Sequence, residues 1–357
     1  MGIVAFTRAR DRLRAADEAE RPLREVNDEV VLAFEQVARF DAAAVMITDP
    51  DTSLPVCGVV KGFDPVLCEP FWDNELLDPD FNKFNQLARV SPPMATLAET
   101  IDGDLDRSPR FTKVYGGCID DELRVAFVAG TTCLAVGVFA RAAGDGPFTP
   151  EELADVRELI PAATVVLRRA LGRVDHATSA QPPVVLILDA TGAVRSVSAG
   201  GQRLLDDLRT QGAEETGLPS IVRAAATRAR WSRNTSSLAT RVQGRDGEWL
   251  RVHVTPMDDG EGSVAVTIEQ ARPGDLVPIM LESYGLTGRE TDVVLYMARG
   301  LSTKEIAEEL LISSHTVRDH IKSVYEKAQV TGRGELLARL FSEHVLEQFH
   351  TSVSHVP

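Results

Sequence analysis

The sequence has 357 residues, of which 44% are hydrophobic and 25% are charged. These fractions are ordinary for a globular protein with room for two or three domains. The formal net charge of −15 argues weakly against a nucleic-acid-binding protein, although DNA affinity depends on local charge. No apolar run approaches the ~20 residues that span a bilayer, and Met1–Phe6 turns at once into a charged stretch. We therefore expect a cytoplasmic protein without a membrane partner.

All four cysteines, Cys57, Cys68, Cys118 and Cys133, lie in the first half of the chain. They form no C-x-x-C pair and no Cys/His spacing of a zinc site, so we predict no metal site. We expect them to be reduced and mostly buried, as in other intracellular proteins, with a redox-sensing role as the alternative.

Residues 1–172 show the pattern of a mixed α+β segment. The apolar spacing predicts a helix over residues 8–40 and another that runs to about Leu171. The later helix begins at Thr149, because Glu152 three residues on completes a capping box. Between the helices, β-rich runs predict strands over residues 43–48, 56–60, 123–129 and 133–140.

A polar, proline-terminated stretch at residues 173–183 predicts a linker, and a second β-rich unit follows it. Asp-Gly turns within this unit favour hairpins. Its pattern predicts strands over residues 184–189, 194–197, 237–242, 249–256 and 263–269, and helices over residues 202–208 and 220–231. Residues 271–284, with two prolines and a glycine, predict a second linker.

Capped helices follow one another closely in the C-terminal segment. The first two open with capping boxes, in which a hydroxyl residue precedes a glutamate by three positions. These boxes are Thr287–Glu290 and Ser302–Glu305. Ser313 caps a third helix that runs to about Ala328, with one apolar face and one polar face. A short helix, a tight turn and such a helix are how a recognition helix is presented to the major groove.

This segment resembles the LuxR-type DNA-binding domain. The residues that carry the resemblance are Leu286-Thr287-x-Arg289-Glu290, Gly300-Leu301-Ser302-Thr303-Lys304-Glu305-Ile306-Ala307, Leu310-x-Ile312-Ser313-x-x-Thr316-Val317-Arg318-x-His320 and Tyr325-x-Lys327. The resemblance implies an all-α, four-helix helix-turn-helix domain over residues 285–347, followed by a tail at 348–357. It also implies double-stranded DNA and the transcription machinery as partners.

On this resemblance, the third helix reads base edges through Arg318, Asp319 and Lys322. Arginine and lysine suit guanine, and aspartate can accept a hydrogen bond from cytosine N4. Asp319 departs from the apolar or neutral residue expected at its position, which suggests an unusual operator. The side chains placed for phosphate contact are Thr303, Lys304, Ser314, Thr316, Lys327 and Arg333. A solvated surface side chain is the alternative for each of them.

A fourth helix is predicted over residues 334–349, with more apolar surface than one face of a small domain needs. The resemblance implies a homodimer contact here, which would match a two-fold operator. Ordinary packing against the first helix of the domain is the alternative. The residues concerned are Leu336, Leu337, Leu340 and Phe341.

The N-terminal part resembles sensory domains of the α+β class. After a helix at residues 1–24, residues 25–172 resemble a GAF domain in Asp121-Glu122-Leu123, the paired strands around Gly130, and Phe148–Leu153. Residues 184–270 resemble a PAS domain in the order of their strands and helices, an antiparallel sheet with helices. Both families imply a site for a small-molecule effector, and no cofactor is identifiable. The candidate pocket residues are Phe71, Trp72, Phe81 and Phe84, with core packing as the alternative.

No catalytic constellation is visible in the sequence. There is no Walker-type glycine loop, G-x-G-x-x-G, H-E-x-x-H or nucleophile elbow, so we predict no catalytic residues and no enzyme. The expected function is a sequence-specific DNA-binding transcription regulator that a small ligand or a partner controls through the N-terminal region. The alternative is a protein-interaction module in which DNA binding is only a weak tether.

Overall fold

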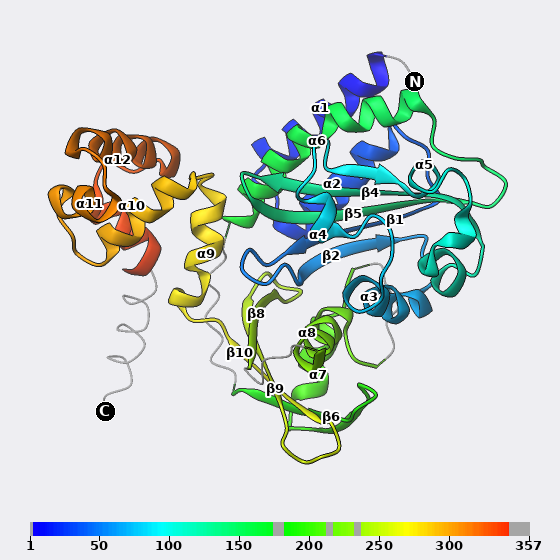
Figure 1. The fold of residues 1–357 in the computed structure, drawn as a ribbon. Coiled ribbons are helices and arrows are strands. Elements are labelled where there is room, and N and C mark those ends of the chain that lie inside the picture. Colours follow the sequence, from blue (N-terminus) through cyan, green and yellow to red (C-terminus); the bar gives the residue numbers. More distant parts are fainter. Residues whose placement is uncertain (1–2, 174–181, 212–216, 232–236, 343–357) are drawn as a thin grey trace. The chain divides into compact units, whose positions relative to one another are not determined.

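The computed structural model describes residues 3–173, 182–211, 217–231 and 237–342 (Figure 1). The chain forms two compact units, Met1–Ala271 and Arg272–Pro357, and each is described by itself. Most of the linker expected at 173–183 lies outside the described residues. The same holds for the last part of the predicted fourth helix and for the expected tail.

The first of the two sheets in the first unit has five antiparallel strands in the order β2-β1-β5-β4-β3. Its strands are β1 (Ala42–Thr48), β2 (Pro55–Lys61), β3 (Met94–Thr96), β4 (Ile119–Ala129) and β5 (Thr132–Ala142). The four predicted strands are confirmed with small shifts of their ends. The sequence analysis missed β3, because a run of three residues is too short to show an alternating pattern.

Helices α1 (Ile3–Glu18), α2 (Leu23–Glu35) and α6 (Pro150–Leu171) cover one face of this sheet (Figure 1). The ring of Phe34 on α2 stacks on that of Phe139, with 5.0 Å between centroids. The single helix predicted over residues 8–40 is wrong. The chain breaks between α1 and α2, where Glu20 has a φ of 49° and Pro22 lacks the amide that would continue a helix. The predicted capping box at the start of α6 is confirmed.

Short helices lie between β2 and β4 along the chain, where we predicted neither a helix nor a strand. They are α3 (Cys68–Leu76), α4 (Phe84–Leu87) and α5 (Leu97–Thr100), with 3₁₀ turns at Pro65–Leu67 and Leu105–Arg107 and a π-helical turn at Arg110–Val114. We call residues 3–173, with the first sheet, the first lobe.

The second lobe, the described residues of 182–271, holds the second sheet, in the order β7-β6-β10-β9-β8. Its elements are β6 (Val184–Leu188), β7 (Val194–Val197), α7 (Gly201–Asp207), α8 (Ser220–Trp231), β8 (Leu238–Gln243), β9 (Trp249–Pro256) and β10 (Val264–Gln270). The predicted strands and helices of this lobe are confirmed, with ends that shift by one or two residues.

Both lobes contribute to one continuous hydrophobic core, to which Trp72 belongs in the first lobe and Ile221 of α8 in the second. A buried ion pair also joins them, because Arg241 of β8 donates from Nε to Oδ2 of Asp49 at 2.6 Å. The same guanidinium donates from Nη2 to Oδ1 of Asp49 at 2.9 Å. The lobes are therefore held together by packing as well as by the chain.

The second unit is helical and contains α9 (Pro273–Ser283), α10 (Gly288–Ala298), α11 (Thr303–Leu310), α12 (Ser314–Ala328) and α13 (Arg333–Leu337). A π-helical turn, η4 (Ala338–Ser342), follows α13 directly. Residues 271–284, predicted as a linker, contain α9. Pro273 stands in its first turn, where a missing amide breaks no helical hydrogen bond, and Leu276 and Ile279 are buried.

Candidate nucleic-acid interface

Local capping sets the geometry of the helix-turn-helix. The three predicted caps of α10, α11 and α12 are confirmed, and Ser313 Oγ accepts a hydrogen bond from the Thr316 amide at 3.1 Å. Between α11 and α12, Leu311 takes the left-handed conformation with a φ of 55°, and the Ile312 amide returns to the Ala307 carbonyl at 3.0 Å. This turn ends α11 sharply and starts α12 two residues later.

Helix α12, predicted to be the recognition helix, separates an apolar face from a polar one. Val317, Val324 and Ala328 are buried. The residues predicted to read bases are all exposed, namely Arg318, Asp319 and Lys322. Their fixed spacing on one helix brings them to a common surface that the described residues of the second unit leave exposed.

Two side-chain pairs lie along that surface. Nδ1 of His315 is 3.0 Å from Oδ2 of Asp319, and Nζ of Lys322 is 3.9 Å from Oε1 of Glu326. All four side chains are mostly exposed, so each pair contributes little to stability in water and can be exchanged for contacts to DNA. His315 was not among the predicted site residues, although its spacing of four from Asp319 would have indicated the contact.

Lys327, predicted to contact phosphate, is engaged within the domain. Its Nζ donates to Oε2 of Glu290 at 2.6 Å, and Ser323 Oγ donates to Oε1 of the same carboxylate at 2.6 Å. Burial by itself would raise the pKa of Glu290, but the hydrogen bonds from Lys327, Ser323 and Thr287 lower it to about 2. These contacts join α12 to α10.

Arg333 also bonds within the domain. Its Nη1 donates to the Leu301 carbonyl at 2.9 Å, and its Nη2 donates to the Met297 carbonyl, so the guanidinium covers the C-terminal end of α10. The other predicted phosphate contacts lie at helix starts. Lys304 is 84% exposed in its side chain, and Thr303, Ser314 and Thr316 are partly exposed in the first turns of α11 and α12.

The predicted dimer contact lies where α13 and η4 pack. Leu336 and Leu340 have no exposed surface, and η4 contacts α9 of the same chain. Leu337 is half-buried, and the side chain of Phe341 lies outside the described residues. Packing within the chain therefore accounts for Leu336 and Leu340 as they stand in this structure.

The candidate effector residues do not all gather in one place. Phe71 and Trp72 line a cavity of about 50 Å³ on the first sheet, together with Ala44. Phe84 does not line this cavity, although its ring lies 4.4 Å from the Arg124 guanidinium, which is also 5.2 Å from the ring of Phe71. The ring of Phe81 lies 5.5 Å from the Arg107 guanidinium.

A buried charge cluster stands beside this cavity on the first lobe. Arg110 and Arg124 have no exposed surface, and each pairs with a carboxylate: Arg110 Nη2 with Glu122 at 2.6 Å, and Arg124 Nη1 with Glu75 at 2.7 Å. Burial would raise the pKa of Glu122, but the two guanidinium groups lower it. The sequence analysis missed the cluster, because charged residues alternating along a strand look like a solvated face.

Among the described residues, no group of three or more His, Cys, Asp or Glu side chains is arranged to hold a metal ion. In the same part of the chain, we find no helix with the length and apolar character needed to cross a membrane.

Comparison with known proteins places the C-terminal segment. The model of the family described as "Bacterial regulatory proteins, luxR family" matches residues 285–340. The spore germination protein GerE of Bacillus subtilis is 42% identical over 62 residues, which are 17% of this chain and 84% of GerE. This chain belongs to the luxR family. The LuxR-type resemblance seen in the sequence is thereby confirmed.

Other luxR-family relatives match over a smaller part of their own length. The transcriptional regulatory protein DesR of Bacillus subtilis is 47% identical over 58 residues, so this chain spans 29% of DesR, with 16% of its own residues aligned. A crystal structure of Escherichia coli SdiA aligns over 94% of this chain and 96% of its own, at 12% identity and a TM-score of 0.34. A TM-score this low does not establish a shared fold.

Proposed function

We propose that this luxR-family chain is a sequence-specific DNA-binding transcription regulator whose helix α12 reads base edges in the major groove. The observation that carries the proposal is the exposed polar face of α12, with Arg318, Asp319 and Lys322. Two cationic side chains on that face suit guanine O6 and N7, and Asp319 suits cytosine N4. The negative charge of the whole chain suppresses binding elsewhere on the duplex.

In this proposal fewer residues contact phosphate than the sequence indicated. Lys304 is exposed, and Thr303, Ser314 and Thr316 stand at helix N-termini, where amides and hydroxyls favour phosphate oxygens. We assign Lys327 and Arg333 to positioning α12, because their donors are bonded to Glu290 and to backbone carbonyls.

We further propose that residues 25–172 form a GAF-like domain and residues 184–270 a PAS-like domain, which sense a small effector. The chain order of strands and helices supports both resemblances. Phe71 and Trp72 border the cavity on the first sheet, so they are the effector residues we retain. A homodimer on a two-fold operator is part of the proposal, with Leu337 as the partly exposed apolar residue of α13.

The second candidate is an interaction module that binds another protein and uses DNA only as a tether. One experiment separates the two: selection of genomic fragments by the full chain, beside an Arg318→Ala, Lys322→Ala variant. The proposal predicts a two-fold motif that wild type enriches and the variant does not. If wild type retains fragments but enriches no motif among them, the tether interpretation is favoured.

A further inference from the structure

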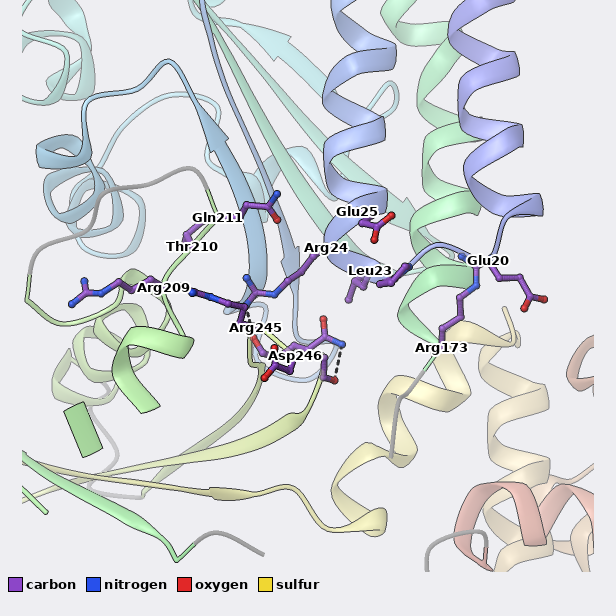
Figure 2. Close-up of a pocket in the computed structure, with 13 residues that line it drawn as sticks. Glu20, Leu23, Arg24, Glu25, Arg173, Arg209, Thr210, Gln211, Arg245 and Asp246 are labelled. Carbon is purple, nitrogen blue, oxygen red and sulfur yellow. Dashed lines mark hydrogen bonds between the residues drawn. The ribbon is translucent and has the colours of Figure 1, made fainter. Parts of the chain in front are cut away.

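A cleft of about 840 Å³ opens between the two lobes of the first unit (Figure 2). One wall is the turn between α1 and α2 with the start of α2, residues 20–25, together with Arg173. The other wall is formed by residues 209–211 and by the turn between β8 and β9, residues 243–247. A cavity of this size is in the range of small-molecule sites, which run to about 1,000 Å³.

Two arginines, one from each wall, lie at the same end of this cleft (Figure 2). Arg24 on α2 crosses to the opposite wall, where its Nε donates to the Gly244 carbonyl at 3.2 Å and its Nη2 to the Gln243 carbonyl at 2.9 Å. Gly244 immediately precedes Arg245, so the guanidinium groups of Arg24 and Arg245 both lie at the turn between β8 and β9. Arg245 donates from Nη2 to the Asp206 carbonyl at 3.3 Å.

Both of these arginines bond only to uncharged groups among the described residues. Their hydrogen bonds go to neutral backbone carbonyls, and within the described residues neither forms an ion pair with a carboxylate inside 4.0 Å. Arg209, also on the wall, differs in this respect, because Asp206 lies 3.2 Å from its Nη2. Guanidinium groups stay charged at any ordinary pH, so two of them at one end of a cleft favour an anion between them.

The carboxylates that line the cleft are spread along it, and Glu25 follows Arg24 in the chain. Figure 2 shows Glu20 and Arg173 beyond Leu23, away from Arg245. Asp246 follows Arg245 in the chain and lies at the cationic end. Repulsion from Asp246 would offset most of the attraction for a ligand with one negative charge. A ligand with several negative charges can contact both guanidinium groups. The arrangement therefore favours a small polyanion.

We propose that this cleft binds a small polyanion, bearing phosphate or several carboxylate groups, between Arg24 and Arg245. Such groups accept paired hydrogen bonds from a guanidinium fork, which makes these contacts short and directional. The ligand would join the start of α2 to the β8–β9 turn and so fasten the first lobe to the second. Neither Arg24 nor Arg245 lines the apolar cavity at Phe71, although Thr210 lines both hollows.

The test is calorimetric titration of the full chain, in low-salt buffer free of phosphate, with pyrophosphate and with citrate as probes. We expect saturable binding of at least one probe. Its affinity should fall at least about tenfold in Arg245→Gln, which removes a charge-assisted contact. The matched control is Arg203→Gln, because Arg203 is an exposed arginine on α7 outside the cleft, and its affinity should equal that of wild type. Whichever probe binds identifies the anionic group.

Three outcomes would overturn this site. The first is that neither probe gives saturable binding, and the second is that Arg245→Gln and Arg203→Gln bind a probe equally well. The third is that Arg245→Gln weakens binding of duplex DNA rather than of either probe, which would make the cleft part of the DNA contact. Arg245 is exposed, so its replacement leaves the fold in place, and an unchanged melting temperature without probe verifies this. Each of these results is independent of whether Arg318 and Lys322 read bases.

Discussion

Lys327 near the end of α12 donates a 2.6 Å hydrogen bond to Oε2 of Glu290 in the first turn of α10. The same carboxylate oxygen accepts from the Thr287 amide at 2.6 Å and so caps α10. One buried carboxylate therefore caps α10 and holds α12 against it. These are residues of the family signature, and in this structure their contacts serve the presentation of α12.

The second unit should lose stability in acid because of Glu290. Its pKa in the folded chain is about 2, below the ordinary value of 4.5, so its stabilising contribution is complete above about pH 4.5 and is lost as the pH falls toward 2. The shift corresponds to about 3 kcal/mol. Urea unfolding at pH 6 and at pH 3, followed by amide exchange in peptides of α12, should show a loss of about 2 kcal/mol, because pH 3 still lies above the folded pKa.

Replacing the carboxylate provides the control for this prediction. Glu290→Gln should destabilise α12 at pH 6 and flatten the dependence on pH, whereas Glu309→Gln, on the exposed surface of α11, should leave both unchanged. An unaltered pH dependence in Glu290→Gln would show that another group is responsible.

Replacing Arg333 by alanine should lower stability, whereas replacing Arg318 by alanine should alter base preference. Arg333 bonds the carbonyls of Met297 and Leu301, so its loss should cost about 1–3 kcal/mol of stability and leave base preference unchanged. Arg318 is exposed, so its loss should leave stability unchanged and relax base preference. Thermal unfolding and fragment selection on both variants measure this, and a loss of base preference in a stably folded Arg333→Ala would contradict it.

The Asp49–Arg241 ion pair should stabilise the interface between the two lobes. Asp49 is fully buried in its side chain and Arg241 is 8% exposed. Asp49→Asn should destabilise the first unit by about 1–3 kcal/mol, because the Arg241 guanidinium then keeps only the exposed Asp51 carboxylate as a counter-charge. Thermal unfolding of the full chain measures the change. The control is Glu261→Gln, which breaks an exposed pair with Arg195 and should cost less than about 1 kcal/mol. Equal effects of the two changes would mean that the buried pair does not hold the lobes.

The cysteines should differ widely in reactivity. Burial raises the pKa of Cys57 and that of Cys133 to about 11, so both stay thiols at pH 8 and react slowly. Cys118 is exposed. Alkylation with iodoacetamide at pH 8, followed by peptide mass spectrometry, should label Cys118 first. If Cys57 were labelled faster than Cys118, the redox-sensing alternative would be favoured.

Local signals made most of the secondary structure predictable. The capping boxes at Thr149, Thr287 and Ser302 fix helix starts within a few residues of chain, so the sequence alone could locate them. The break between α1 and α2 was also local, since Pro22 cannot continue a helix, but the apolar stripe of residues 8–40 outweighed it in the sequence analysis. The exposed face of α12 followed directly from helical periodicity.

Long-range contacts made the rest unpredictable. Lys327 and Arg333 looked like phosphate ligands, because their partners, Glu290 and the Leu301 carbonyl, lie 37 and 32 residues away in the chain. The burial of Arg124 likewise depends on Glu75, which lies 49 residues away. Periodicity shows which face of an element a residue occupies, but it does not show which other element covers that face.

The most direct test of the central claim is the ratio of affinities for a selected duplex and a scrambled duplex at about 0.15 M salt. For the wild-type chain we predict a ratio of at least about 10³. The Arg318→Ala, Lys322→Ala variant should lower that ratio about tenfold or more, because each lost base contact removes about 1–3 kcal/mol of discrimination. Lys304→Ala, at an exposed phosphate-contact position, should weaken both duplexes and preserve the ratio. A wild-type ratio near one would contradict the account and favour a module that only tethers itself to DNA.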